Sequence, residues 1–285
     1  MICHQRKIRE EMLTKEGCAL DGFSLKECSV EQISRKEAAE IILRYEWLAS
    51  MPQVGRYYYG LVRPDGKIIG ATCFGLGPSR KARDFCGENQ IERVLCLERG
   101  ACAPIKPRNK HADGAASKLI RRSCAKLVDD TAKTERIGAF FAYSDVAAGE
   151  VGTVYQASGW TYIGQGAGRV KSGTMHNRAL MGRYDYIDPE GNRHTSRRMR
   201  AMLKRTNYDD GHLGHWFQKV GKPAGWTKVR QYEKHKYVLI LAKDMQLDTD
   251  RFPPQPQYPS RLVQSVGAQL VDWRQHRWPC YGVKE

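Results

Sequence analysis

Between residues 34 and 164 the chain alternates between stretches with helical spacing and stretches with strand spacing. Apolar residues recur every three or four positions in the first type, and short apolar runs form the second. The order is helix, strand pair, strand, helix, strand, helix, strand. Helices that separate strands in this way pack on the faces of a sheet, so the order predicts an α/β fold with a mixed central sheet flanked by helices.

Local chemistry marks the boundaries of these elements. Ser34 precedes Glu37 by three residues, which is the pattern of a capping box at a helix start. The turn at 64–66, Pro-Asp-Gly, predicts a hairpin, because proline presets the first turn dihedral and glycine tolerates positive φ. The other predicted elements are strands at 91–104, 137–143 and 160–164 and helices at 114–130 and 150–159.

The rest of the chain has weaker patterns. The first 28 residues lack a clear period and are expected to form a loosely attached N-terminal extension. After residue 165 the chain is basic and Gly-rich, with one predicted helix at 195–205 and one strand at 236–243. We therefore expect four regions: the extension (1–28), the α/β core (29–165), a basic region that completes the fold (166–243), and a proline-rich linker and tail (244–285).

Composition narrows the class of protein. A chain of 285 residues with 41% hydrophobic residues can bury a large core. No apolar run reaches the roughly 20 residues of a membrane span, and no apolar stretch follows the charged N-terminus, so we expect a soluble, intracellular protein. Nine cysteines without a CxxC pair favour reduced core residues over a disulfide framework or a zinc ribbon.

Positive charge is concentrated in one part of the chain. The net charge is +16, and residues 165–236 hold 16 Lys or Arg against 6 Asp or Glu, a net of +10. Such a block can be a solvated face, but clustered cations in a basic protein favour binding to a polyanion. Nucleic acid is the predicted partner.

The stretch at 142–160, AYSDVAAGEVGTVYQASGW, carries a family resemblance. Tyr155, followed after three intervening residues by Gly159 and then Trp160, resembles the last helix and strand of the GNAT acyltransferase fold. The longer match, which includes Tyr143-Ser144-Asp145 and the run 149–157, together with YEWLASMPQVGRYYYGL upstream and HKYVLIL downstream, is similar to the Mom family of bacteriophage DNA modification proteins. This resemblance covers roughly residues 34–243.

The resemblance implies a GNAT-like enzyme that converts adenine in double-stranded phage DNA to N6-carbamoylmethyladenine, an anti-restriction modification made in the cytoplasm of the infected host. A purine amine is a poor nucleophile, so its acylation needs a base, oxyanion donors and an acid. Asp145 would orient or deprotonate the amine, and Ser144 would hold the base edge or an acyl oxygen. Tyr155 stands where GNAT enzymes place a phenol that protonates the leaving group, and Glu98 where many keep a general base.

Each of these residues also has a structural interpretation. Ser-Asp after a strand is a common turn or helix N-cap. The phenol of Tyr155 can be a core side chain, and Glu98 can form an ion pair with Arg99.

The predicted cofactor loop departs from the pattern of acetyl-CoA users. Such loops present backbone N–H groups to a pyrophosphate at a helix start. Here the run 111–116 reads His-Ala-Asp-Gly-Ala-Ala, with a glycine and an alanine in place but a histidine first and an aspartate where phosphate would lie. A small-residue helix start is the structural alternative. The residues expected to bind the cofactor are Lys106, Arg108, His111, Gly114 and Ala116, and Lys110 could also compensate.

Two acyl donors remain open. Acetyl-CoA would require a later amidation. The carbamoylmethyl product is an isomer of N6-glycyl adenine, so an activated glycyl group, such as that of glycyl-tRNA, could supply every atom through an intramolecular rearrangement. In that case the basic region would serve two polyanions.

The basic region contains a predicted DNA-binding helix. In HTSRRMRAMLKR, Met199, Met202 and Leu203 form one stripe while cations occupy the rest, although a solvated amphipathic helix has the same pattern. Arg197, Arg198, Lys204 and Arg205 are the residues expected to contact phosphates. The enzyme would have to flip the adenine out of the duplex, and Tyr57, Tyr58, Trp160 and Trp216 are the candidates for stacking on it. His212 and His215 alone are weak evidence for a metal, and none is predicted.

Three functions from different classes follow. The DNA adenine modifier is favoured. The alternatives are a GNAT N-acetyltransferase that acts on a protein or small amine, and a non-catalytic nucleic-acid-binding protein on the same fold.

Overall fold

The computed structural model describes residues 4–106, 114–145, 149–165, 184–191, 193–195, 199, 202–203, 213–230 and 234–255. Two compact units make up the chain, one formed by residues 1–169 with 234–261 and the other by 170–233 with 262–285. The first unit therefore contains the predicted core together with the strand expected at 236–243.

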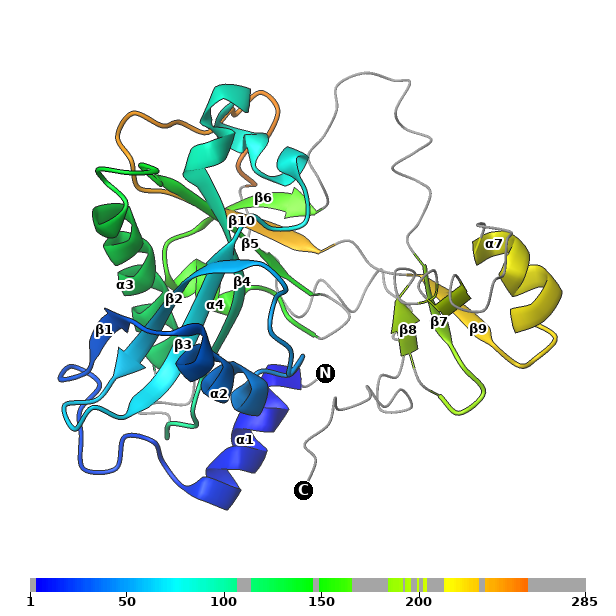
Figure 1. Cartoon of the computed structure of the whole chain (residues 1–285), viewed down its shortest axis with the longest axis horizontal. Coiled ribbons are helices and arrows are strands. Elements are labelled where there is room, and N and C mark those ends of the chain that lie inside the picture. Colours follow the sequence, from blue (N-terminus) through cyan, green and yellow to red (C-terminus); the bar gives the residue numbers. More distant parts are fainter. Residues whose placement is uncertain are drawn as a thin grey trace. The chain divides into compact units, whose positions relative to one another are not determined.

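A seven-stranded sheet organises the first unit, in the order β1-β2-β3-β4-β5-β10-β6 (Figure 1). Its strands are β1 (Ser29–Gln32), β2 (Gly55–Val62), β3 (Ile68–Gly75), β4 (Val94–Cys102), β5 (Ala139–Ser144), β6 (Thr161–Gln165) and β10 (His235–Ile240). All neighbours pair antiparallel except β4 and β5, which are parallel. The predicted α/β fold with a mixed central sheet is confirmed.

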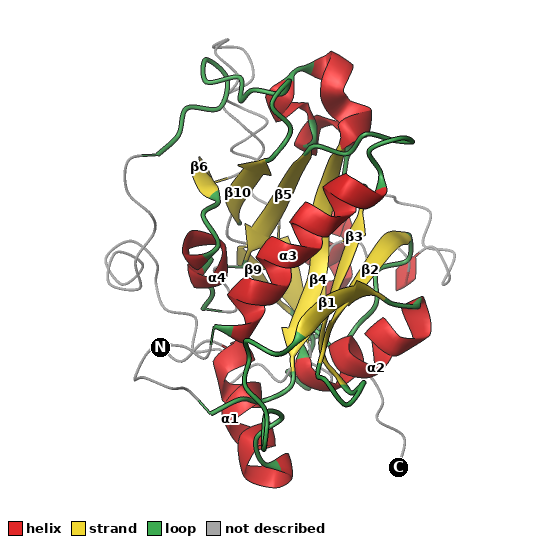
Figure 2. Ribbon diagram, turned by 90° about the vertical axis from the view of Figure 1, so that its left-hand side faces the viewer, coloured by secondary structure: helices red, strands yellow, loops and turns green. Residues whose placement is uncertain are grey.

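Helices cover both faces of this sheet. They are α1 (His4–Glu16), α2 (Arg35–Tyr45), α3 (Ala115–Asp130) and α4 (Thr153–Ala157), with short 3-10 turns at Arg80–Ala82, Asp84–Cys86 and Glu88–Arg93. Figure 2 shows α3 lying across the sheet. Its buried residues, Ala115, Leu119, Ile120, Ser123, Cys124 and Leu127, form one stripe, as an amphipathic helix on a sheet requires.

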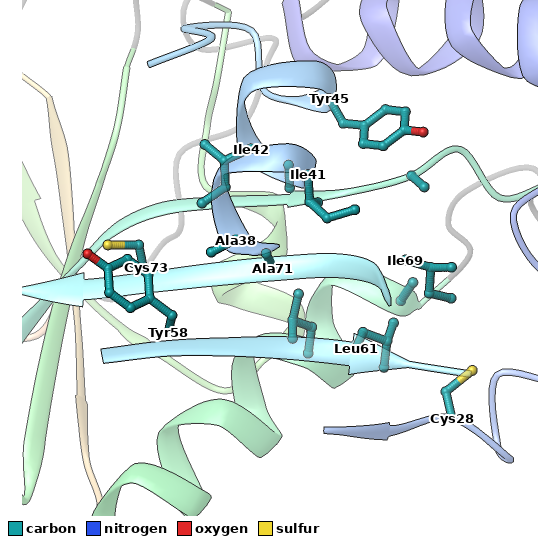
Figure 3. Packing of buried hydrophobic residues seen from close by; sticks show 14 of the residues in the cluster. Cys28, Ala38, Ile41, Ile42, Tyr45, Tyr58, Leu61, Ile69, Ala71 and Cys73 are labelled. Atoms are coloured by element: carbon teal, nitrogen blue, oxygen red, sulfur yellow. The ribbon is translucent and has the colours of Figure 1, made fainter. Parts of the chain in front are cut away.

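The local predictions about caps and turns are confirmed. Ser34 and Glu37 form both hydrogen bonds of the capping box at the start of α2. The β2–β3 hairpin closes at Gly66, whose φ is +84° and whose N–H donates to the Arg63 carbonyl over 2.9 Å. Figure 3 shows Ala38 and Ile42 of α2 facing Ala71 of β3 in the core that this arrangement buries.

The N-terminal extension differs from the expectation. Residues 4–16 form α1. Gln5 of this helix binds the C-terminal end of α2, donating to the Tyr45 carbonyl over 2.6 Å and accepting from the Trp47 N–H over 3.1 Å. Glu16 accepts from Arg44 and from the Tyr45 hydroxyl. Ile8, Met12 and Leu13 share one partly buried face of this short helix, and Met12 packs against the core.

The second unit contains a three-stranded antiparallel sheet, ordered β8 (Arg193–Thr195), β7 (Tyr184–Ile187), β9 (Thr227–Arg230). The helical segment α7 (Leu213–Trp216) continues into a π-helical turn, Phe217–Gly221. The prediction of a helix from residue 195 is wrong at its start, because 193–195 pair with β7 as a strand. Met199 and Leu203 pack with Tyr186, Leu213, Trp216, Phe217 and Trp226.

Candidate active site

The parallel strands β4 and β5 separate part of the way along their length. They pair only at Val94–Cys96 with Ala139–Phe141. Beyond this point β4 continues against β3, and β5 continues against β10 as far as Ser144. In the described part of the chain, the facing edges of 97–102 and 142–144 therefore have no strand partner on that side. Backbone polar groups at such a parting need another partner, which makes it a place for a ligand.

Glu98 lies in a bulge of β4 beside this parting. Cys73 pairs with Arg99 and Phe74 pairs with Leu97, so Glu98 is the extra residue. Its Oε1 accepts from the Gly77 N–H over 3.0 Å, and its buried Oε2 has no hydrogen-bond partner among the described residues. Burial raises the pKa of Glu98.

Arg99 does not pair with the Glu98 carboxylate. Its guanidinium donates to the backbone oxygen of Glu98 and lies 3.4 Å from Oε2 of Glu46, the residue that follows α2. Glu46 is buried, and this burial raises its pKa to about 8 even though the Arg99 cation opposes the shift. Sequence reasoning missed Glu46 because it lies 53 positions from its partner, and nothing local distinguishes it from a helix-end glutamate.

Ser144 and Asp145 lie at the end of β5, as predicted. The Ser144 side chain is buried, with 1% exposure, and its hydroxyl has no hydrogen-bond partner among the described residues. The Asp145 carboxylate forms an ion pair with Lys234 over 2.8 Å. The neutral hydroxyl is thus left for a ligand, whereas the carboxylate is already held by a cation.

Glu150 closes the loop that follows β5. Its Oε2 accepts from the Asp145 N–H over 3.3 Å, and its own N–H donates to the Asp145 carbonyl over 3.1 Å. Trp47 donates a further hydrogen bond to the carboxylate. Burial raises the pKa of Glu150 to about 7. The sequence signal that could have indicated Glu150 was a carboxylate between two glycines, Gly149 and Gly152. Both glycines have positive φ in the structure.

Tyr155 projects from α4 into an aromatic cluster. Its ring centroid lies 5.3 Å from that of Trp160 and 5.2 Å from that of Tyr237. Burial, followed by the charge of Glu150, raises the pKa of Tyr155 well above its usual value. The phenol therefore stays protonated, and it can donate a hydrogen bond or a proton but does not serve as a base near neutral pH.

The proposed stacking aromatics are mostly unavailable for contact with a base. Trp160 is fully buried, Trp216 is 6% exposed within the core of the second unit, and Tyr58 is 8% exposed. Tyr57 is partly buried, and its hydroxyl donates to Glu135. The suggestion that Trp160 or Trp216 stacks on a flipped base is wrong, because both side chains serve as core.

The predicted cofactor residues are only partly described. Gly114 caps the start of α3 in the left-handed conformation, with φ +76°, and among the described residues no side chain caps this helix. Ala116 lies in the first turn, and Lys106 is exposed. These features fit a phosphate-bearing donor at the helix start. Arg108, Lys110 and His111 lie outside the described residues.

The predicted phosphate-contacting residues, Arg197, Arg198, Lys204 and Arg205, also lie outside the described residues, as does His212. Met202 is 37% exposed, so only Met199 and Leu203 of the predicted stripe pack inward. Exposed cations of the described second unit include Lys219, Lys222 and Lys228.

Metal-binding and membrane-spanning features are not found in the described residues. In this portion of the chain, no three His, Cys, Asp or Glu side chains are grouped to hold a metal ion. Within the same residues, no helix has the length and apolarity to cross a membrane. Cys18, Cys28, Cys73, Cys86, Cys96 and Cys124 are free thiols.

Comparison with known proteins gives one family. No curated protein matches the chain. Among solved structures, an acetyltransferase from Bacillus subtilis in complex with CoA is 8% identical, with a TM-score of 0.34 over 75% of this chain and 99% of that one. The spermidine/spermine N-acetyltransferase SpeG from Vibrio cholerae is 9% identical, with a TM-score of 0.35 over 76% and 94%. An IAA acetyltransferase from Bacillus cereus is 12% identical, with a TM-score of 0.32 over 75% and 99%. Residues 27–260 match the model of the Mom protein family, and the chain therefore belongs to the Mom protein family, as its motifs predicted.

Proposed function

We propose that this protein is an acyltransferase that modifies the N6 amine of adenine in double-stranded DNA, toward N6-carbamoylmethyladenine. The observation that carries the acyl-transfer part is the buried Ser144 hydroxyl, unpartnered among the described residues, at the parting of β4 and β5. Glu150 and Tyr155 stand close enough to each other for the charge of one to raise the pKa of the other. A hydroxyl, a titratable carboxyl and a protonated phenol are the groups that acylation of a weak amine needs.

Each group has a proposed role in this reaction. Ser144 donates a hydrogen bond to the acyl oxygen as negative charge develops on it. Tyr155 gives its proton to the departing group. Asp145, held by Lys234, orients the acceptor base, and Glu98 fixes the bulge of β4 beside the acyl group.

Membership of the Mom family supports DNA as the acceptor, and the charge distribution agrees with it. Residues 165–236 carry a net charge of +10, which favours a polyanion. Since the adenine amine lies inside the duplex, the base has to leave the stack before it reaches a buried hydroxyl. Protection of phage DNA from restriction in the host cytoplasm is the proposed purpose.

The donor is proposed by chemical class as an activated acyl compound. Gly114 and Ala116 at the start of α3 would hold a phosphate of such a donor, which supplies the electrophilic acyl carbon. Acetyl-CoA and glycyl-tRNA both satisfy this description. A glycyl group has the further advantage that N6-glycyl adenine and the carbamoylmethyl product are isomers, so no other reactant is needed.

Nucleoside mass spectrometry of DNA from expressing cells tests the function. The wild-type chain should yield a mass-shifted deoxyadenosine, and Ser144→Ala should yield little or none at equal protein level and melting temperature. Unmodified DNA together with acetylated protein or polyamine would instead identify an N-acetyltransferase of another amine. A chain that retards duplex DNA in a gel without changing it would be a binding protein.

A further inference from the structure

We propose that Glu150 is the general base that takes the proton from the attacking adenine amine, in place of Asp145 and Glu98. The inference rests on the proposed function and assigns a further residue of the same site. It follows from what each of the three carboxylates contacts.

Asp145 is held by a strong partner. Its carboxylate lies 2.8 Å from the Lys234 ammonium, with the aspartate side chain 20% and the lysine 44% exposed. In this contact the lysine ammonium occupies Oδ2 of Asp145. Asp145 is therefore better suited to orient a substrate through its fixed charge.

Glu98 is enclosed by the end of β3 and the turn that follows it. Its Oε1 is occupied by the Gly77 N–H. Its Oε2 is buried against Gly75, where an ideal Cβ would lie only 2.6 Å away. A substrate amine does not reach an oxygen packed in this way, so Glu98 is a bulge-fixing residue.

Glu150, whose side chain has an intermediate exposure like that of Glu98, lies among the groups of the site. Its backbone and carboxylate are both bonded to Asp145, the residue directly after the buried Ser144 hydroxyl. Its charge acts on Tyr155 and on Glu46, which lies 3.4 Å from Arg99. The buried Ser144 hydroxyl, which has no hydrogen-bond partner among the described residues, is an independent sign of a ligand here, since buried polar groups in folded proteins are mostly satisfied.

The surroundings keep this carboxylate titrating near neutral pH. Burial raises the pKa of Glu150 to about 7, and the charge of Asp145 adds to the shift. The hydrogen bond from the Asp145 N–H, the charge of Lys234 and the Trp47 hydrogen bond oppose it. Glu46, with a pKa of about 8 beside Arg99, is protonated in the same range, and Tyr155 stays protonated above it. A base whose pKa lies near the working pH is the most effective one.

The step balances without an additional reactant. The adenine nitrogen forms a bond to the acyl carbon of the donor, and the proton removed from that nitrogen passes to the Glu150 carboxylate. The bond from the acyl carbon to the leaving sulfur or oxygen breaks, and the leaving group takes a proton from Tyr155. Glu150 then returns its proton to solvent, and Tyr155 regains one.

The test uses the full chain, duplex DNA and, in separate reactions, acetyl-CoA or glycyl-tRNA. For the wild type, the rate of deoxyadenosine modification should rise about tenfold per pH unit below about 7 and level off above it. Glu150→Gln should reduce the rate about 100-fold or more and abolish this rise. Lys234→Gln should keep the rise but shift it to higher pH, since a cation that lowers the pKa of Glu150 is gone. Glu40→Gln, the same change on an exposed residue of α2, should behave as wild type.

Three results would overturn the inference. The first is Glu150→Gln within tenfold of wild type with an unchanged pH profile. The second is a larger loss of rate in Asp145→Asn than in Glu150→Gln, with the increase of rate with pH abolished only in Asp145→Asn. If Glu150→Gln melts below the assay temperature, Glu150→Asp replaces it. This variant should modify DNA at least tenfold more slowly than wild type, with the increase of rate with pH retained. An unaltered rate in Glu150→Asp is the third overturning result.

The same experiment distinguishes failure of the proposed function from failure of the Glu150 assignment. If the wild type modifies no deoxyadenosine with either donor or in expressing cells, the proposed function falls, and the assignment of Glu150 falls with it. If the wild type modifies DNA and Glu150→Gln shows the same pH profile, only the assignment of Glu150 is wrong and the proposed function stands.

Discussion

At the scale of single residues, Gly152 and Lys236 show how closely the first unit is packed. Gly152 precedes α4 with φ +66°, and an ideal Cβ there would lie 2.3 Å from the Tyr237 ring. Tyr237 in turn donates to the Val151 carbonyl over 2.6 Å. Lys236, next in sequence, is 1% exposed, donates to the Ala82 carbonyl over 2.8 Å and lies 5.2–5.3 Å from the ring centroids of three phenylalanines.

Gly152→Ala should lower the free energy of unfolding by about 2–4 kcal/mol, because it combines left-handed backbone strain with a steric overlap against a fixed ring. Gly159→Ala is the matched control. Gly159 has a similar φ of +78°, but an added Cβ would meet nothing within 4 Å. We expect a decrease of only about 1 kcal/mol there. Equal decreases in urea unfolding would show that the Tyr237 ring gives way.

Lys236 should make stability depend on pH in the alkaline range. Burial lowers its pKa from 10.5 to about 8, so between these values the unfolded chain binds more protons than the folded one. Stability therefore rises as the pH goes from about 8 to 10.5, by at most about 3 kcal/mol from this group. The difference in unfolding free energy between wild type and Lys236→Met, measured across this range, should move in favour of wild type. A constant difference would contradict the assignment.

At the scale of elements, α1 positions the segment that follows α2. Gln5 bonds to the backbone on both sides of Glu46, through the Tyr45 carbonyl and the Trp47 N–H. Glu46 and Trp47 then reach Arg99 and Glu150. This support lies outside the family match, because α1 ends before residue 27, where the match begins.

Gln5→Ala should lower the free energy of unfolding by about 1–2 kcal/mol, since two hydrogen bonds to the backbone are removed. It should also slow DNA modification, because Glu46 and Trp47 no longer have their support. Glu11→Ala is the control, as its pair with Lys7 is half-exposed on the same helix at 3.7 Å. Should both variants modify DNA at the wild-type rate, α1 would stabilise the fold without affecting the site.

At the scale of the whole molecule, most of the positive charge and the candidate active site lie in different parts of the chain. The net charge of +16 is concentrated in residues 165–236, whereas the candidate active site lies in the first unit, on β4, β5 and the segments that follow α2 and β5. The second unit buries its aromatic residues in its own small core and keeps lysines exposed. Contacts between cations and phosphates position a nucleic acid without reading its sequence.

Replacing Arg197, Arg198 and Lys204 by Ala should weaken binding to all duplexes alike. The slope of log affinity against log salt should fall by about 0.9 for each phosphate that is no longer neutralised. Fluorescence anisotropy at several salt concentrations, with two unrelated duplexes, measures both effects. A change in which adenines are modified, with the slope unchanged, would instead mean that these residues read bases. Binding and slope left untouched by the triple variant would point to the exposed cations between Lys219 and Lys236.

The sequence by itself determined the features that depend on a few neighbouring residues. The capping box at Ser34, the hairpin turn at Gly66, the stripe of α3 and the position of Ser144 at a strand end all follow from contacts within about one helical turn or one β-turn. The family resemblance likewise depended on short motifs, and the family match confirmed it.

Only the tertiary structure decided which distant groups meet. The Asp145 carboxylate pairs with Lys234, 89 positions away, because β10 inserts between β5 and β6. Glu46 meets Arg99 because α2 packs on the sheet, and α1 is held against the end of α2 by Gln5 and by the packing of Met12. Such pairings depend on strand order and register, which summed long-range packing fixes and no local pattern encodes. Sequence reasoning therefore left the base open between Asp145 and Glu98, whereas the contacts of the folded chain favour Glu150.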